Sequence, residues 1–237
     1  MSAHLPYISQ FESSALASEF LEGRLETTED PNWRNSGWTR PRDYGFWAWH
    51  TCGVACLRMI LPPGAATAAE LTSDLVRAGA YQVSGQHVTG LIYHPFADYI
   101  RSRWGLSGTV HRTLGMERVR DALGRPDTVM MLSVNPAIRN VTTDDPPPSG
   151  LAPGGHLVLA TKASAEDITF HDPSGHPYRQ SNVTLSWEHF GPHFAGRGIE
   201  ITVQRAPHRN QPLDRVSLLG HAPLKVHVAI SSTCNTP

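Results

Sequence analysis

The sequence lacks the features that mark membrane-spanning and nucleic-acid-binding proteins. None of its apolar runs approaches the roughly 20 residues that a helix needs to cross a bilayer. Its 20 lysines and arginines are balanced by 21 aspartates and glutamates, and they form no basic run. Such a chain offers no electrostatic footprint for a nucleic acid. We therefore expect no membrane and no nucleic acid among its partners.

Cysteine is scarce, and a targeting signal is not visible. Cys52, Cys56 and Cys234 are too few for a disulfide framework, and the first two lie one helical turn apart, a spacing seldom bridged within a regular helix. The segment after Met1 has neither the basic stretch nor the apolar core of a secretory signal. We therefore expect a reducing, cytoplasmic location, unless the protein leaves the cell by a route that the sequence does not reveal.

What is present is the composition of an ordinary globular protein, with 40% hydrophobic and 17% charged residues. Predicted helices come first and predicted strands second, which is typical of an α+β domain. We expect N-terminal helices packed on a C-terminal antiparallel sheet within residues 1–205, and an appendage of unknown role at 206–237. The strand at 128–134 is apolar on both faces, so we expect it at the centre of the sheet. The predicted segments are helices at 11–21, 52–61, 68–79, 96–104, 116–123 and 187–194, a loop at 24–45, and strands at 109–112, 128–134, 155–161, 167–171, 198–204 and, weakly, 225–230.

Residues 49–63 contain the first candidate catalytic residue. Cys52 and Gly53 open an apolar run of helical length that Pro62-Pro63 closes. A thiol in the first turn of a helix faces the positive end of the helix dipole, which favours the thiolate. The stretch alone leaves two interpretations open, because a cysteine on an apolar helix is also commonly a small core residue. Cys56, one turn deeper, is most simply part of the core.

A base for such a thiol, and a group to orient the base, occur in the second half of the chain. His156 begins one predicted strand, and Asp172 follows the next, 16 residues later. If the two strands form a hairpin, the start of the first lies beside the end of the second, so His156 and Asp172 would be neighbours. Singly, each has a simpler interpretation, as a strand-end histidine and as part of an Asp-Pro-Ser-Gly turn. Together with Cys52 they favour a catalytic triad.

These motifs make the sequence resemble a known family. They are Cys52-Gly53 at a helix start, Gly155-His156-Leu157-Val158-Leu159 on a strand, Asp172-Pro173 after the next strand, and Leu5-Pro6-Tyr7-Ile8-Ser9-Gln10 near the N-terminus. In this order they are similar to the papain-like cysteine peptidases related to the bacteriocin-processing, double-glycine leader peptidases. The resemblance covers residues 5–204. It implies a papain-like fold and a bacterial thiol hydrolase.

The resemblance also implies a role for each motif residue. Cys52 would be the nucleophile, His156 the general base and acid, and Asp172 the residue that orients His156. Gln10 would donate its side-chain amide to the oxyanion, together with the backbone N–H of Cys52. In most relatives this glutamine lies only a few residues before the cysteine, whereas here 41 residues intervene. Residues 11–45 would then be an insertion that loops out and returns as a lid or a substrate wall.

Other residues near Cys52 have roles that stay open. If Gln10 is not the oxyanion donor, the nearby candidates are Trp47, Trp49 and His50, of which His50 is the first to test. Trp47 and Trp49 would either line an apolar cleft for an acyl group or peptide, or serve as ordinary packing.

No cofactor and no metal are expected. His189 and His193 have the spacing of zinc ligands on a helix, but Gly191-Pro192 breaks a regular helix between them and no third ligand is evident. His171 and His176 flank the Asp-Pro-Ser-Gly turn, and we expect them to line its surface.

The residues together predict a cysteine-dependent acyl-transfer enzyme that works through a thioester. With water as the acceptor it is a peptidase or amidase, which is the leading hypothesis. With an amine or a carbon nucleophile it is an acyltransferase or cyclase that acts on a peptide or a carrier-bound metabolite. A papain-like binding module without turnover is the alternative of another class. The expected partner is a peptide or acyl substrate, free or bound to a carrier protein; the residues indicate neither its identity nor the oligomeric state.

Overall fold

The computed structural model describes residues 5–142 and 149–203. Its helices, with short 3-10 turns labelled η, are η1 Ser14–Leu16, α1 Ala17–Leu21, η2 Thr27–Glu29, η3 Trp33–Ser36, α2 Pro41–Ala48, α3 Cys52–Ile60, α4 Ala68–Arg77, α5 Tyr93–Trp104, α6 Met116–Leu123, η4 Pro136–Asn140, α7 Trp187–Phe190 and η5 Gly191–His193. Its strands are β1 Gln82–Ser84, β2 His87–Thr89, β3 Ser107–His111, β4 Thr128–Val134, β5 His156–Ala163, β6 Asp167–His171, β7 Val183–Ser186 and β8 Phe194–Thr202.

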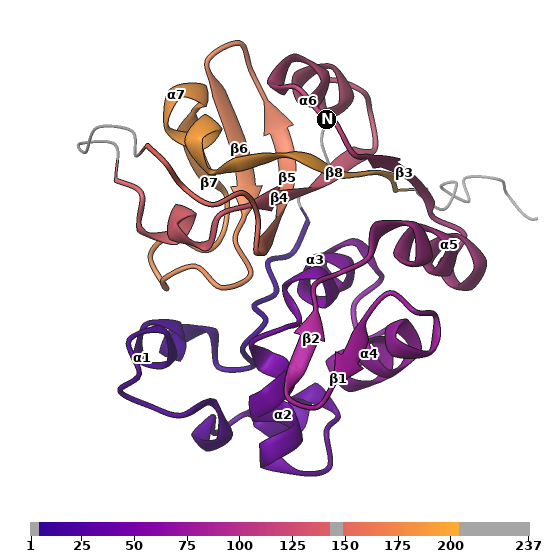
Figure 1. Cartoon of the computed structure of the whole chain (residues 1–237), viewed down its shortest axis with the longest axis vertical. Coiled ribbons are helices and arrows are strands. Elements are labelled where there is room, and N and C mark those ends of the chain that lie inside the picture. The colour runs from indigo at the N-terminus through magenta and orange to yellow at the C-terminus, as the bar shows by residue number, and fades with distance from the viewer. Residues whose placement is uncertain (1–4, 143–148, 204–237) are drawn as a thin grey trace, which may run out of the picture. The chain divides into compact units, whose positions relative to one another are not determined.

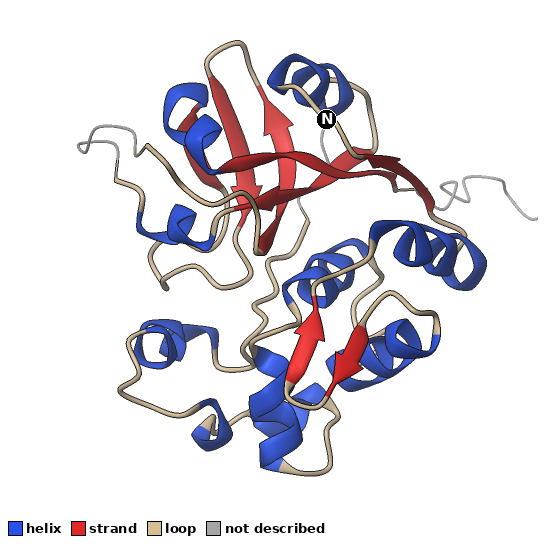
Figure 2. Ribbon diagram, viewed as in Figure 1, coloured by secondary structure: helices blue, strands red, loops and turns tan. Residues whose placement is uncertain are grey.

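A six-stranded antiparallel sheet organises the second half of the described chain (Figure 2). Its strand order is β3-β8-β4-β5-β6-β7, so the last described strand lies between β3 and β4. Every residue of β4 is buried. The predicted α+β class and the central position of this strand are therefore confirmed.

The two faces of β4 are covered by different helices, which explains why the strand is apolar on both. Met131 belongs to a core shared with α3, α4 and α5, whereas Met130 belongs to a second core shared with α6 and α7. Figure 1 shows α6 and α7 on one side of the sheet and α3 and α5 on the other. Because successive side chains of a strand point to opposite faces, one apolar run fills both cores.

Local signals set the ends of several helices as expected. α4 begins with a capping box, in which Thr67 Oγ1 accepts from the Glu70 N–H at 3.2 Å and Glu70 Oε2 accepts from the Thr67 N–H at 2.8 Å. α5 ends at Gly105, whose φ of 68° is the left-handed value of a C-cap. α6 has the predicted bounds.

Other parts of the fold differ from the prediction. The helix expected at 11–21 begins as the 3-10 turn η1 and becomes α-helical only at Ala17. Part of the loop expected at 24–45 is α2, whose first residue, Pro41, has a φ already suited to that position. The hairpin β1–β2 was not predicted, because its side chains are mostly exposed. The edge strand β7 was also not predicted, because its four residues are too short a run to give a clear signal.

The segment between Gln10 and α2 has a small core of its own. Phe11 and Tyr44 are buried in it. The fully buried carboxylate of Asp30 accepts hydrogen bonds from the Ser13 N–H, at 3.0 Å, and from the Tyr44 hydroxyl. Such partners offset the cost of burying a charge. The segment is therefore a packed substructure, against which Trp33 and Trp38 are partly buried.

No helix in residues 5–142 and 149–203 is long and apolar enough to cross a membrane. The predicted appendage at 206–237, with its weak strand at 225–230, lies outside the described residues, as does Cys234.

Candidate active site

Cys52 is the first residue of α3, which packs against β5. The glycine after it allows a close approach: a Cβ on Gly53 would lie 2.9 Å from Leu91 Cδ2 and 3.3 Å from the Tyr81 hydroxyl. The Cys52 sulfur receives hydrogen bonds from the backbone of Gly53 and Leu157. The Cys52 thiol therefore lies among backbone N–H donors at the start of α3. The glycine that follows it lets this helix start pack closely against Leu91 and Tyr81.

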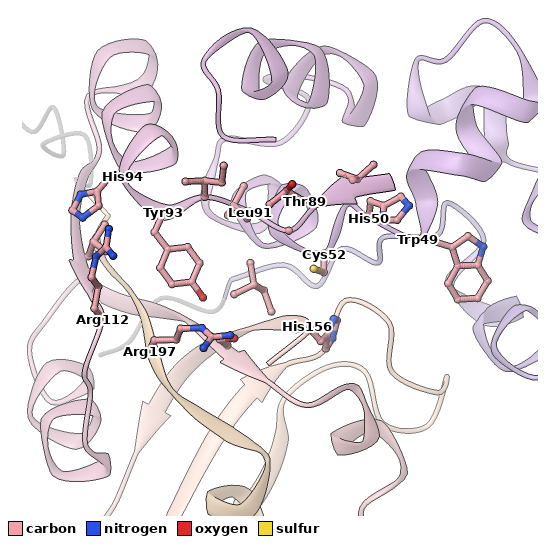
Figure 3. Close-up of a pocket in the computed structure, with 17 residues that line it drawn as sticks. Trp49, His50, Cys52, Thr89, Leu91, Tyr93, His94, Arg112, His156 and Arg197 are labelled. Carbon is pink, nitrogen blue, oxygen red and sulfur yellow. The ribbon is translucent and has the colours of Figure 1, made fainter. Parts of the chain in front are cut away.

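His156 is the first residue of β5, where it pairs with Val134 of β4. The two residues before it, Gly154 and Gly155, have φ values of 85° and 101°, a conformation that favours glycine. This sharp turn feeds the chain into β5 and leaves the imidazole buried, facing Cys52 (Figure 3).

Asp172 follows β6 directly, and the antiparallel register that pairs Leu159 with His171 brings it next to His156. His156 Nε2 lies 2.7 Å from Asp172 Oδ1. The adjacent placement that the hairpin predicts is therefore found. With Nε2 paired to the carboxylate, Nδ1 is the ring nitrogen left for the Cys52 thiol, to which His156 is also hydrogen-bonded.

The electrostatics of the three groups favour a thiolate beside an imidazolium. Burial alone would raise the pKa of Cys52, but the hydrogen bond and charge of His156 outweigh it, and the net pKa is below the usual thiol value. Burial alone would lower the pKa of His156, but the carboxylate of Asp172 raises it to about 9. Burial also opposes ionisation of Asp172, yet His156 holds the pKa of that carboxyl below its usual value. Each charge is thus stabilised by the next.

Residues that the sequence did not single out support Asp172. The Ser174 N–H donates to Asp172 Oδ1 at 3.0 Å, and the Ser174 hydroxyl lies 3.2 Å from His156 Nε2. The Tyr7 hydroxyl donates to the Asp172 carbonyl oxygen at 3.1 Å. The Arg139 guanidinium adds a positive charge that lowers the pKa of Asp172 further. Ser174 and Tyr7 carried an indirect signal, since Ser174 belongs to the Asp-Pro-Ser-Gly turn and Tyr7 to the N-terminal motif, whereas Arg139 carried none.

The two candidates for the oxyanion donor occupy different positions. Gln10 is buried, its Nε2 donates to the Ala48 carbonyl oxygen at 2.8 Å, and its backbone N–H donates to the Pro173 carbonyl oxygen at 2.9 Å. Gln10 thus ties the turn after Asp172 to the segment just before Cys52. His50 lines the cavity described next. Burial lowers the pKa of His50, so the neutral ring is favoured and can donate one N–H.

A cavity of about 590 Å³ opens beside Cys52 and His156 (Figure 3). Its other lining residues are Trp49, His50, Val88, Thr89, Gly90, Leu91, Ile92, Tyr93, His94, Val110, Arg112, Ser133, Gly155, Leu157 and Arg197. Trp49, whose side chain is 45% exposed, forms part of this wall. Trp47 instead stacks on Trp38, with ring centroids 6.0 Å apart, and is not in the lining. No residue of the segment 11–45 lines this cavity, so that segment is not its wall.

The remaining histidines differ from one another. His171 was expected at the surface of the turn, but it is only 1% exposed, and its Nδ1 accepts a hydrogen bond from the Asn182 N–H at 3.1 Å. That expectation was wrong, because His171 ends a strand whose last residues point into the fold. His193 is also buried. Within residues 5–142 and 149–203, no group of three or more metal-ligating side chains comes together.

The sequence matches no protein-family model, and no similar curated protein is found. The functional conclusion therefore depends on the geometry of the site and on the motifs themselves.

Proposed function

We propose that this protein is a papain-like Cys-His-Asp enzyme that transfers acyl groups, and that it acts as a peptidase or amidase. The observation that carries the proposal is the hydrogen-bonded series Cys52, His156 and Asp172, whose first two members line a cavity of about 590 Å³. The order of the motifs, with their resemblance to the bacteriocin-processing peptidases, supports the same chemistry. A nucleophile, a base and an orienting carboxylate in one cavity are the parts that acyl transfer requires.

The reaction proceeds in two halves. The Cys52 thiolate attacks the substrate carbonyl carbon, and a C–S bond forms while the carbonyl oxygen becomes an oxyanion. As this intermediate collapses, the C–N bond breaks and the leaving amine takes the proton from the His156 imidazolium. Water then gives a proton to His156 and attacks the thioester, which releases the acid and restores the thiolate. An amine in place of water yields a transferred or cyclised product.

The oxyanion needs donors aimed at the place where its charge develops. The backbone N–H of Cys52 is one. Gln10 is the second donor that the resemblance indicates, and His50 is the one that the cavity lining indicates. We propose that one of these two side chains completes the oxyanion hole.

Cys56 provides an internal comparison that favours catalysis over a binding role. It lies on the same helix, one turn from Cys52, and burial raises its pKa well above the usual thiol value. The pKa of Cys52 is shifted the other way by a specific partner, His156. A perturbed pKa with a named charge partner in a cleft is typical of a functional site.

The test uses the native protein and iodoacetamide between about pH 5 and 10, with the modified cysteine mapped by mass spectrometry. Cys52 should react at a pH well below the free thiol pKa of about 8.5, and Cys56 should stay unmodified. In His156→Ala the profile should return to that of an ordinary thiol. Labelling of Cys52 no faster than a model thiol, unchanged by His156→Ala, would sink the proposal.

The oxyanion donor is tested separately, by turnover of an activated ester such as p-nitrophenyl acetate. Loss of the true donor in Gln10→Ala or His50→Ala should lower the turnover rate by about a hundredfold. The iodoacetamide profile of Cys52 should be unaltered in that variant. Near-normal turnover in both variants would show that neither side chain is the donor.

A further inference from the structure

The cavity is chemically asymmetric. Figure 3 shows Trp49 and His50 toward one end and Arg112 and His94 at the other, with Cys52 between them. Among the residues that the structure describes, the lining contains two arginines and no aspartate or glutamate. Apolar side chains also line the cavity, from Val88, Leu91, Val110 and Leu157. The cavity therefore combines positive charge at one end with a partly apolar lining.

Arg197 lies on β8, and Arg112 directly follows β3, the neighbouring strand. The register of the two strands ends with His111 paired with Gly198, and Arg112 and Arg197 are the next residues along the two chains. Two positive charges in one cavity repel each other, and a bound anion relieves that repulsion.

No carboxylate of residues 5–142 and 149–203 supplies that relief. Among the described residues, the ion pairs within 4.0 Å include neither Arg112 nor Arg197. Glu200, on the same strand as Arg197, is engaged by Arg125 and by His111, whose Nε2 lies 3.2 Å away.

Arg197 is held in place even though it forms no ion pair with another described residue. It hydrogen-bonds to the Tyr93 hydroxyl, which Ser133 also contacts. A Cβ on Gly154 would collide with the Arg197 guanidinium, so the glycine turn before His156 leaves room for this side chain. A guanidinium has five N–H donors, and one bond to Tyr93 leaves most of them for a ligand.

Building on the proposed function, we propose that Arg112 and Arg197 bind a carboxylate of the substrate. This carboxylate lies at a fixed distance from the carbonyl that Cys52 attacks. The carboxylate belongs to an aspartate or glutamate side chain or to the C-terminus of a short peptide. The planar guanidinium fork matches a carboxylate in two parallel hydrogen bonds. The apolar lining residues of the cavity accommodate the chain that links the two groups.

The test exploits alkylation of Cys52, which needs no known substrate. The reagents are N-iodoacetyl derivatives of glycine, β-alanine, 4-aminobutyrate and 6-aminohexanoate, each compared with its own primary amide. At one spacer length the acid should react about tenfold or more faster than the amide, as a charge-assisted pair predicts. The preference should decline as salt is added. Equal rates for acid and amide at every length would overturn the proposal.

Variants assign the preference to the arginines. Arg112→Gln and Arg197→Gln should each lower the acid-to-amide ratio about tenfold, while Arg197→Lys should retain part of it. Arg42→Gln is the matched control, because Arg42 is exposed on α2 and does not line the cavity. A ratio that survives the double variant Arg112→Gln/Arg197→Gln, in protein whose Cys52 still reacts normally with iodoacetamide, would contradict the assignment.

Further reagents identify the source of the anion and separate the two proposals. Iodoacetyl-glutamate amide carries only a side-chain acid and iodoacetyl-glutamine only a terminal one, so a preference for either names the source. A phosphonate reagent that outpaces every carboxylate would overturn the choice of carboxylate. If Cys52 is no more reactive toward iodoacetamide than a model thiol, the proposed function fails. If it is reactive but indifferent to charge, only the present inference fails.

Discussion

Asp172→Asn tests the electrostatic basis of the site most directly. The change keeps the shape of the side chain but removes the charge that lies 2.7 Å from His156 Nε2. Asp172 is the first group that raises the pKa of His156 to about 9, against the burial that opposes it. Without that charge the pKa of His156 should fall to its ordinary value of about 6.5 or below.

The size of the effect follows from these two values. At about pH 7.5 a histidine of pKa about 9 is about 97% protonated, whereas one of pKa about 6.5 is about 9% protonated. Removal of the Asp172 charge alone therefore lowers the protonated fraction of His156 about tenfold. This protonated form is the imidazolium that supports the Cys52 thiolate. Loss of the ring orientation set by Asp172 adds to this, so we expect acyl transfer to slow by more than about tenfold.

The assay is the pH dependence of Cys52 alkylation, with turnover of an anilide substrate measured in parallel. In the wild type, turnover of the anilide should decline as pH rises through about 9, because the amine leaving group needs the proton that His156 then loses. In Asp172→Asn this decline should move toward neutral pH. The alkylation profile of Cys52 should move to higher pH, because the thiolate loses its cationic partner.

Asp30→Asn is the control, since Asp30 is also a fully buried carboxylate but belongs to the separate core of Phe11 and Tyr44. It should lower the melting temperature and leave both pH profiles unchanged. The reasoning is refuted if folded Asp172→Asn keeps the wild-type profiles, or if Asp30→Asn shifts them equally.

The folded-state pKa of His156 is raised, so the stability that His156 contributes is present below about pH 6.5 and lost as pH rises through about 9. The stability difference between wild type and Asp172→Asn should therefore narrow above that pH.

Two further substitutions probe the packing around the site. Gly53→Ala places a Cβ 2.9 Å from Leu91 Cδ2, so it should lower the free energy of unfolding by about 1–3 kcal/mol in urea titrations and slow alkylation of Cys52. His193→Phe removes two buried ring nitrogens that have no hydrogen-bond partner among the described residues, and should stabilise the fold by about 1–3 kcal/mol. Burial lowers the pKa of His193, so its neutral form carries stability that is present above about pH 6.5 and lost as pH falls. The gain from His193→Phe should therefore be larger at about pH 5 than at about pH 8 in the same titrations.

Each of these has a clear opposing result. Unchanged stability and labelling in Gly53→Ala would show that α3 does not need a close approach at its first turn. A gain from His193→Phe that is equal at both pH values, or smaller in acid, would show that protonation of His193 does not cost stability in the fold.

The parts of the fold that the sequence predicted well are those with a strong local or periodic signal. The capping box of Thr67 and Glu70 identified the start of α4, and apolar residues on both faces identified β4 as central. The hairpin of β5 and β6 was also predicted, because a short polar turn joins two apolar strands. That one inference was enough to bring His156 and Asp172 together.

Segments with weak signals were missed for physical reasons. In β7 only Leu185 is fully buried, so edge pairing with β6 decides its conformation more than its own pattern does. α2 begins at a proline in a polar stretch, and its burial comes from packing in the small core around Phe11. His171 was assigned to the surface because a turn follows it, but packing against Tyr7, with ring centroids 5.9 Å apart, helps bury it.

The sequence by itself determined the triad candidates, because a thiol at a helix start and a His–Asp pair across a hairpin depend on local geometry alone. It also determined the α+β class, since the order of helices and strands is visible in the periodicity. Only the tertiary structure decided what surrounds the thiol. Arg112 and Arg197 are 85 residues apart, and nothing local brings them together; the insertion of β8 beside β3 does so. The chemistry at Cys52 follows from short-range order, whereas the charge of its cavity is a product of long-range strand pairing.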